Sequence, residues 1–281
     1  MTRHPIGVAA GRNLIRLSSG FGVFILTLLL ALAAFPSLFA PFDATERVAR
    51  PLQRPNEENI LGTNDIGQDV FSELIAGTRA SLFTGLIVAF ISIFIGTIIG
   101  LASGYLGGWA DSLLMRLTDL ILVLPFLPLV ILIAVYLGPN QRNVILVLAV
   151  FFWAGPARLI RSQVLSLKSE PYIEAARALG ANPIRIMRRH LWSGVQPLVL
   201  VQIVLVASAS ILAESSLSFL GLGDPSAKSW GSMLYFARAS GAFLGDAWKW
   251  WVLPTGLMIT LSVLSLGLIG YSLEQRITSS K

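Results

Sequence analysis

Long apolar segments recur along the chain and are separated by polar stretches. Six segments hold about twenty nearly continuous apolar residues, which is the length that a helix needs to cross a bilayer core of roughly 30 Å. They cover approximately residues 20–40, 82–106, 113–137, 143–163, 196–218 and 251–273. The pattern predicts an all-α membrane protein with six transmembrane helices.

Basic residues show which side of the membrane each loop occupies. They concentrate in the N-terminal tail, in the stretch between the fourth and fifth apolar segments, and in the C-terminal tail. In the opposite loops they are diluted by carboxylates. Because cytoplasmic loops carry an excess of Lys and Arg, both termini and the central polar stretch are predicted to be cytoplasmic. The first segment is longer than a signal-peptide core and is expected to be an uncleaved span.

Small and helix-breaking residues occur inside two of the predicted spans. Gly96, Gly100 and Gly104 repeat at four-residue intervals, and Gly108 continues the row. Such spacing predicts close packing against another helix, although glycine is also simply common in membrane helices. Pro125 and the nearby Pro128 are expected to bend the third span.

Few ionisable residues fall within the predicted spans. Arg116 and Asp119 are three residues apart and are expected to form a local pair. Glu214 lies near the outer end of the fifth span, where it either lines a pathway or has a structural role. Three tryptophans near the start of the last span predict an interfacial aromatic belt: Trp248, Trp250 and Trp251.

The outer segment over residues 41–81 is expected to be partly ordered. Apolar residues repeat at helical spacing after Asp69, which is an N-cap candidate, and Gly77 offers a stop. The pattern predicts a short interfacial helix that leads into the second span.

The central polar stretch contains "EPYIEAARALGANPIRIMRRH", residues 170–190, which has helical periodicity. Pro171 suits a first helical turn, and Gly180 suits a left-handed stop. Read as a helix, the stretch has one apolar stripe, which is narrow and small in volume, and Glu174 and Arg177 project away from it. Its members are Tyr172, Ala175, Ala176 and Leu179.

A second short helix is expected to start at Asn182 and Pro183. It would place Ile184, Met187 and Leu191 on one side and three arginines on the other: Arg185, Arg188 and Arg189. Two short helices joined at a glycine could lie on anionic lipid. Paired alanines and a glycine in place of bulky anchors favour docking in a protein groove.

Composition excludes several other classes of protein. Hydrophobic residues make up 54% of the 281 residues and charged residues 13%, which is far from a soluble domain. The net charge of +6 therefore does not indicate nucleic-acid binding. The chain has no cysteine and two histidines, and no lysine follows a glycine, so the phosphate-binding GxxxxGK[ST] loop is absent. No cofactor or metal is expected on this chain, and any ATP would be bound by another.

The stretch "YIEAARALGA", residues 172–181, resembles the EAA signature of ABC importer permeases through Glu174, Ala175, Ala176 and Gly180. Three further stretches resemble the C-type permease subunit of dipeptide, oligopeptide and nickel importers. They are "LGTNDIGQDVFSELIAGTRASL" (61–82), "AESSLSFLGLG" (213–223) and "WGSML" (230–234). Two departures are Leu191-Trp192 in place of the usual Leu-Pro, and "GLIGYSLEQRI" in place of a Gly-Asp-Gly-Leu-Arg-like run.

The resemblance implies a type I ABC importer permease fold in the bacterial cytoplasmic (inner) membrane. It also implies a second, homologous permease subunit, two ATP-binding subunits and an external solute-binding protein as partners, beside membrane lipid. The central stretch would then be a cytoplasmic coupling helix seated on an ATP-binding subunit. Its residues would be Tyr172, Glu174, Ala175, Ala176, Arg177, Leu179, Gly180 and Ala181.

The resulting hypothesis is a non-catalytic permease subunit that moves di- or oligopeptides by alternating access. Nickel or another small solute is the alternative substrate, and an ion-gradient-driven secondary transporter or a membrane scaffold is the alternative class. We expect a tail, first span and external segment over residues 1–79, a five-helix core over 80–273 with the coupling insert at 164–195, and a cytoplasmic tail over 274–281.

Overall fold

The computed structural model describes residues 6–279, with side chains from residue 17 to residue 275. This part of the chain is helical, with two isolated bridges and no β-strand. The helices are α1 (Ile6–Ala34), α2 (Pro36–Phe39), α3 (Val70–Leu106), α4 (Gly108–Val123), α5 (Phe126–Leu137), α6 (Gln141–Phe152), α7 (Ala154–Lys168), α8 (Pro171–Ala178), α9 (Pro183–Arg185), α10 (Trp192–Phe219), α11 (Trp230–Ala239) and α12 (Val252–Ser279). A π-helical turn, η1 (Ile186–Leu191), and a 3-10 turn, η2 (Ala247–Lys249), complete the set.

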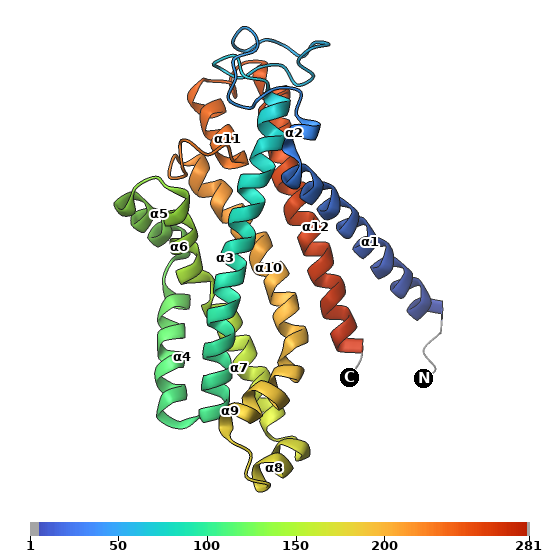
Figure 1. Ribbon diagram of the computed structural model, residues 1–281, viewed down its shortest axis with the longest axis vertical. Coiled ribbons are helices and arrows are strands. Elements are labelled where there is room, and N and C mark those ends of the chain that lie inside the picture. Colours follow the sequence, from blue (N-terminus) through green and yellow to red (C-terminus); the bar gives the residue numbers. More distant parts are fainter. Residues whose placement is uncertain (1–5, 280–281) are drawn as a thin grey trace.

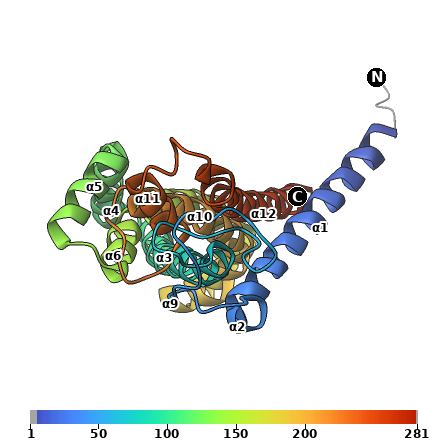
Figure 2. The ribbon, with the colours of Figure 1, turned by 90° about the horizontal axis from the view of Figure 1, so that it is seen from above.

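The helices form an elongated bundle with α3 and α10 at its centre (Figures 1 and 2). Helix α1 lies at one edge and packs mainly on α12, whereas α4, α5 and α6 lie at the opposite edge. The irregular segment before α3 covers one end of the bundle, and α8 projects from the other (Figure 1). The two ends are therefore different surfaces joined by long helices.

Five helices of the described chain are long and apolar enough to cross a membrane, and the α4–α5 pair raises the number to six if it is one span. The first span is shorter at its outer end than predicted, because its apolar stretch is Leu17–Ala34 and Pro36 begins α2. The predicted bend in the third span is confirmed, since α4 and α5 meet at 89°. Pro125 lies at the break and cannot continue the hydrogen-bond ladder.

The glycine row of α3 packs against α7, as its spacing predicts. A Cβ atom added at Gly96 would lie 2.8 Å from the Trp153 carbonyl oxygen, and one at Gly100 would lie 2.7 Å from that of Ala157. Only residues without side chains allow two backbones to approach so closely. The expectation that Gly108 continues the row is wrong, because Gly108 has φ +58 in the turn that begins α4 and nothing lies within 4 Å of its Cβ position.

Polar contacts hold the ends of α3, α4 and α7 together next to α8. Arg161 of α7 donates two hydrogen bonds of 2.6 Å to the carboxylate of Asp111, which also accepts one from Ser103 of α3. The Lys168 Nζ atom donates to the Tyr105 carbonyl oxygen at 2.7 Å. We call these five residues the inner clamp. Two parallel bonds fix both distance and orientation, so the clamp makes these helix ends one rigid unit.

The predicted local pair between Arg116 and Asp119 is wrong. Asp119 pairs instead with Arg158 of α7. The close contact of α4 with α7 brings Arg158 to the carboxylate, so a partner from another helix replaces the neighbour three residues away.

The predicted short helix before the second span is also wrong, although its start is confirmed. Asp69 caps α3 by accepting a hydrogen bond of 2.8 Å from the Ser72 amide. The helix then continues through Gly77 to Leu106, across the boundary expected at residues 79 and 80. Gly77 makes room for the buried Trp230, whose ring would lie 3.1 Å from an added Cβ. It is a packing position and not a stop.

The segment 41–69 and the loops flanking α11 and α12 form an outer lobe. Lys228, just before α11, donates hydrogen bonds of 2.7 Å to the buried carboxylate of Glu73 and to the side chain of Gln68. The predicted aromatic belt is wrong for two of its three members, since Trp250 and Trp251 are buried. Trp250 lies beneath this lobe, where a Cβ added at Gly62 would be 3.0 Å from its ring.

Replacing Gly100 with Val should weaken the packing of α3 against α7, because the new side chain would overlap the Ala157 carbonyl and Ile160. Overpacking of this kind costs about 1–3 kcal/mol. We expect a lower thermal unfolding temperature for the variant in detergent. Gly256→Val in α12 is the matched control, since nothing lies within 4 Å of that Cβ position. Equal unfolding temperatures for both variants would contradict this account of the interface.

Candidate functional site

Helix α8 projects from the inner end of the bundle, where it contacts α7 and η1 (Figure 1). Pro171 occupies the first turn, as predicted, because its fixed φ and missing N–H suit that position. Glu174 lies in the first turn and Arg177 in the last. Both charges complement the helix dipole, which helps so short a helix to form.

Gly180 ends α8 in the left-handed conformation that its position predicts. It has φ +77, and its amide donates to the Arg177 carbonyl at 3.0 Å. The Ala181 amide donates to the Ala176 carbonyl at 3.1 Å. These bonds satisfy carbonyl groups that the helix end leaves free, and a glycine adopts this conformation without strain.

Most of the predicted stripe faces outward. Leu179 is 88% exposed and Tyr172 is 47% exposed, and Ala175 is exposed beside them. Ala176 and Ala181 are half-buried, whereas Glu174, Arg177 and Gly180 are exposed. The structure therefore brings all eight predicted site residues into one projecting element. Small exposed side chains around one leucine form a surface that another protein can approach closely.

Ile173 holds α8 on the bundle, and the predicted site does not include it. Its side chain is fully buried in the core cluster that contains Ile160 and Val164 of α7 and Leu191 of η1. A displacement of α8 relative to α7 would therefore expose this buried side chain. The signal in the sequence is that Ile173 is the one β-branched aliphatic residue between Pro171 and Gly180.

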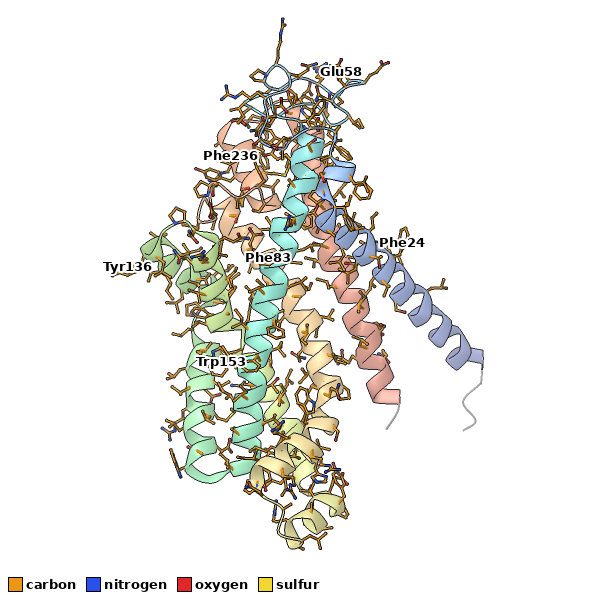
Figure 3. All side chains as sticks on the ribbon, viewed as in Figure 1. Phe24, Glu58, Phe83, Tyr136, Trp153 and Phe236 are labelled. Carbon is orange, nitrogen blue, oxygen red and sulfur yellow. The ribbon has the colours of Figure 1, made fainter. Side chains whose placement is uncertain are left out.

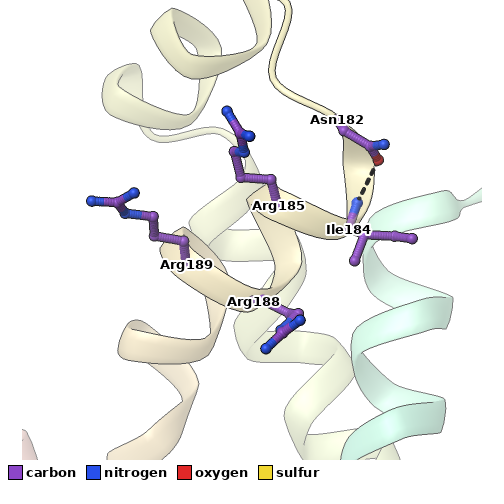
Figure 4. A pocket seen from close by; sticks show the side chains of 5 residues that line it. All are labelled: Asn182, Ile184, Arg185, Arg188 and Arg189. Carbon is purple, nitrogen blue, oxygen red and sulfur yellow. Dashed lines mark hydrogen bonds between the residues drawn. The ribbon is translucent and has the colours of Figure 1, made fainter.

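The predicted second short helix is the beginning of a long one. Asn182 caps it by accepting a hydrogen bond of 3.0 Å from the Ile184 amide, as expected (Figure 4). From Pro183 the helix then continues through α9, η1 and α10 to Phe219. The insert therefore contains one isolated helix, α8, and the N-terminal extension of the fifth span.

The predicted apolar side of this extension is wrong at Ile184, which is 59% exposed. Ile186 is fully buried in its place, whereas the predicted members Leu191 and Met187 are fully buried and half-buried. In a π-helical turn residues five apart share a face, so a 3.6-residue period fails there. The sequence contains no proline or glycine within η1 that would indicate this turn.

A basic surface lies beside the predicted docking helix. A cavity of about 530 Å³ is lined by Asn182, Ile184 and three arginines, Arg185, Arg188 and Arg189. The arginines are exposed, and none forms an ion pair within the chain from residue 17 to residue 275. Figure 4 shows Arg185 and Arg189 extending from one side of the helix and Arg188 from another.

Glu214 lies in the outer part of α10 and is not part of the α8 site. The residue is 5% exposed, and its carboxylate accepts hydrogen bonds from Ser218 at 2.7 Å and from Ser215 at 3.4 Å. It thus has local hydroxyl partners and also lines a small cavity. Among the described residues no group of three or more His, Cys, Asp or Glu side chains could hold a metal.

Comparison with known proteins shows the family to which this sequence is similar. Residues 93–279 match the family described as "Binding-protein-dependent transport system inner membrane component". The dipeptide transport system permease protein DppC of Bacillus subtilis is 34% identical over 255 residues, which are 90% of this chain and 79% of the relative. The glutathione transport system permease protein GsiD of Pectobacterium atrosepticum is 36% identical over 256 residues, 90% of this chain and 83% of the relative. The oligopeptide transport system permease protein OppC of Bacillus subtilis is 34% identical over 75% of this chain and 70% of the relative.

Proposed function

This chain belongs to the family of binding-protein-dependent transport system inner membrane components, and we propose that it is a permease subunit that imports di- or oligopeptides. It is a multi-pass inner-membrane protein with the type I ABC importer permease fold. The observation that carries the proposal is α8, an exposed helix of small residues fixed to the bundle through the buried Ile173. Relatives named for dipeptide, oligopeptide and glutathione transport support a peptide as the substrate.

We propose that α8 docks on one of two ATP-binding subunits and that these hold ATP and Mg²⁺. A second, homologous permease subunit and an external solute-binding protein complete the assembly. The exposed surface of α8 supports the proposal that this chain transports the solute and that separate subunits hydrolyse ATP. Leu179 and Tyr172 expose apolar surface at the end of the bundle, where a soluble partner would cover it.

Movement of the ATP-binding subunits would reach the membrane through α7. Ile173 packs between α7 and η1, and the inner clamp joins α7 to α3 and α4. Because these helix ends move as one unit, displacement of α8 would tilt several spans together. Alternating access follows if ATP binding favours the arrangement of the bundle that is open to the outside.

Nickel or another small solute is a second candidate substrate, and an ion-gradient-driven transporter is a candidate of another class. Import that requires ATP hydrolysis by partner subunits separates the ABC importer from the secondary transporter. Identification of the solute that accompanies the purified complex separates peptide from nickel.

Gly180→Val should cut ATP-driven peptide uptake strongly while the permease is still inserted and expressed. The reason is the backbone, because φ +77 is unfavourable for a β-branched residue and no atom lies within 4 Å of the Cβ position. Gly180→Asn is the matched control, since asparagine tolerates the left-handed region, and it should be milder. Uptake by vesicles that contain the whole transporter, measured beside the ATPase rate, checks both.

Ala176→Asp tests the docking face itself. A charge on the half-buried edge of the stripe would lose solvation on docking, at a cost of about 1–3 kcal/mol or more. Glu174→Gln keeps a polar group and should be the milder change. Full uptake by both Ala176→Asp and Gly180→Val would show that α8 does not couple the permease to the ATP-binding subunits.

Both termini are proposed to be cytoplasmic. The chain has no native cysteine, so single cysteines can be placed at Glu57, which is exposed in the outer lobe, and at Lys281. A membrane-impermeant maleimide should label the first from outside the inner membrane and the second only after the membrane is opened. The reverse pattern would invert the topology.

Purified alone, the chain should neither bind nor hydrolyse ATP, because its sequence contains no phosphate-binding GxxxxGK[ST] loop. Equilibrium binding of radiolabelled ATP to the isolated subunit checks this prediction. The complete complex serves as the positive control. Micromolar affinity of the isolated subunit would refute the proposed division of labour.

A further inference from the structure

A cavity of about 400 Å³ lies in the outer half of the bundle, away from α8. Ala76, Arg79, Ala80 and Phe83 of α3 line one wall, and Gln141 of α6 with Ala227 and Lys228 lines the other. The four α3 residues share one helix face, since they are three or four residues apart. The volume is within the usual range for small-molecule sites.

Arg79 is the available cation of this cavity. Its side chain is exposed, and it forms no ion pair in the described part of the chain. Lys228 differs, because its ammonium group is already bound at 2.7 Å to the carboxylate of Glu73. A guanidinium group presents a fork of donors that matches a carboxylate with two parallel hydrogen bonds.

A second, much smaller cavity adjoins the first. Both are lined by Gln141 and Ala227, so these two residues border both spaces. The Gln141 amide is held there by donating to Thr84 at 2.9 Å. The small cavity has a volume of about 10 Å³, room for a group the size of one water molecule or one ammonium ion.

Two carboxylates line the small cavity, Glu214 and Asp224. Glu214 is buried and accepts hydrogen bonds from serine hydroxyls, and it forms no ion pair in the described part of the chain. A buried carboxyl group without a cationic partner is costly to ionise, so an ammonium group that entered the cavity would stabilise its ionised form and be bound by it. Hydrogen bonds from the Ser226 hydroxyl and amide lower the pKa of Asp224, which keeps it ionised at neutral pH.

We propose that these adjoining cavities bind the two charged ends of a peptide on its way through the permease. Arg79 receives the terminal carboxylate, and Glu214 with Asp224 receives the terminal ammonium group. Phe83, which lines the same cavity as Arg79 and is 55% exposed on α3 (Figure 3), offers apolar surface to a peptide side chain. The inference rests on the proposed function, and it makes this chain a determinant of specificity for unblocked peptides.

The test measures binding to the complete complex of permease and ATP-binding subunits. The solute-binding protein is left out, so that its own affinity for peptides does not contribute to the signal. The probe is radiolabelled alanyl-phenylalanine, with its C-terminal amide and its N-acetyl form as competitors. Loss of one charge-assisted contact should weaken binding about ten- to a hundredfold. The wild type should therefore prefer the unblocked dipeptide to either competitor.

Each variant should remove one of these preferences. Arg79→Gln should weaken binding of the free dipeptide and abolish the preference over the amide, but keep the preference over the N-acetyl form. Glu214→Gln should do the opposite, with Asp224→Asn as a second variant on the same side. Arg142→Gln is the matched control, since Arg142 is exposed next to Gln141 and lines neither cavity, and it should bind like the wild type.

Equal loss for all three ligands in Arg79→Gln, with recovery in vesicles richer in anionic lipid, would assign Arg79 to a lipid phosphate and overturn the proposal. A wild type without preference for the unblocked dipeptide would overturn it as well. Uptake of the dipeptide by the full transporter with its solute-binding protein is measured in parallel. Uptake without the binding preference rejects this inference alone, whereas absence of both rejects the proposed function.

Discussion

The backbone-to-backbone contact of α3 with α7 is the constraint on which the rest of the structure depends. Gly96 and Gly100 bring the two helices so close that a single added carbon would overlap a carbonyl group. Helix α3 is about 55 Å long at 1.5 Å per residue, and it extends from the outer lobe to the inner clamp. Because α8 directly follows α7, and α7 packs along α3, the surface of α8 and the outer lobe are connected through one long helix.

Sequence periodicity identified the spans and their approximate order, because lipid requires long helices with internally satisfied backbones. It also located the bend at Pro125, the cap at Asp69 and the left-handed Gly180. These features depend on local chemistry, which a sequence displays directly. Errors arose where a distant element decided the outcome. Gly77 lies inside a helix, where Trp230 packs against it. Asp119 forms its ion pair with Arg158 of another helix.

The candidate site shows the same division. Its eight predicted residues lie together because α8 and the turn that ends it hold them all, but the buried Ile173 that anchors the helix was not predicted. Arg79 and Asp224 could not be connected from sequence, since their cavities are built by α3, α6, α10 and the loop before α11. Glu214 was noticed only as a carboxylate inside a span, and its surroundings became evident from the packing of α10.

The π-helical turn η1 sets how α9 is rotated relative to α10. A π turn is equivalent to one extra residue in an α-helix, and each residue corresponds to about 100° of rotation. Removal of one residue between Ile186 and Leu191 would leave both flanking helices intact and rotate one against the other. The length of this segment, and not the chemistry of its exposed side chains, thus sets the direction in which the face of α9 points. Permeases that differ here by one residue would present that face, with the exposed Arg185, in a different direction.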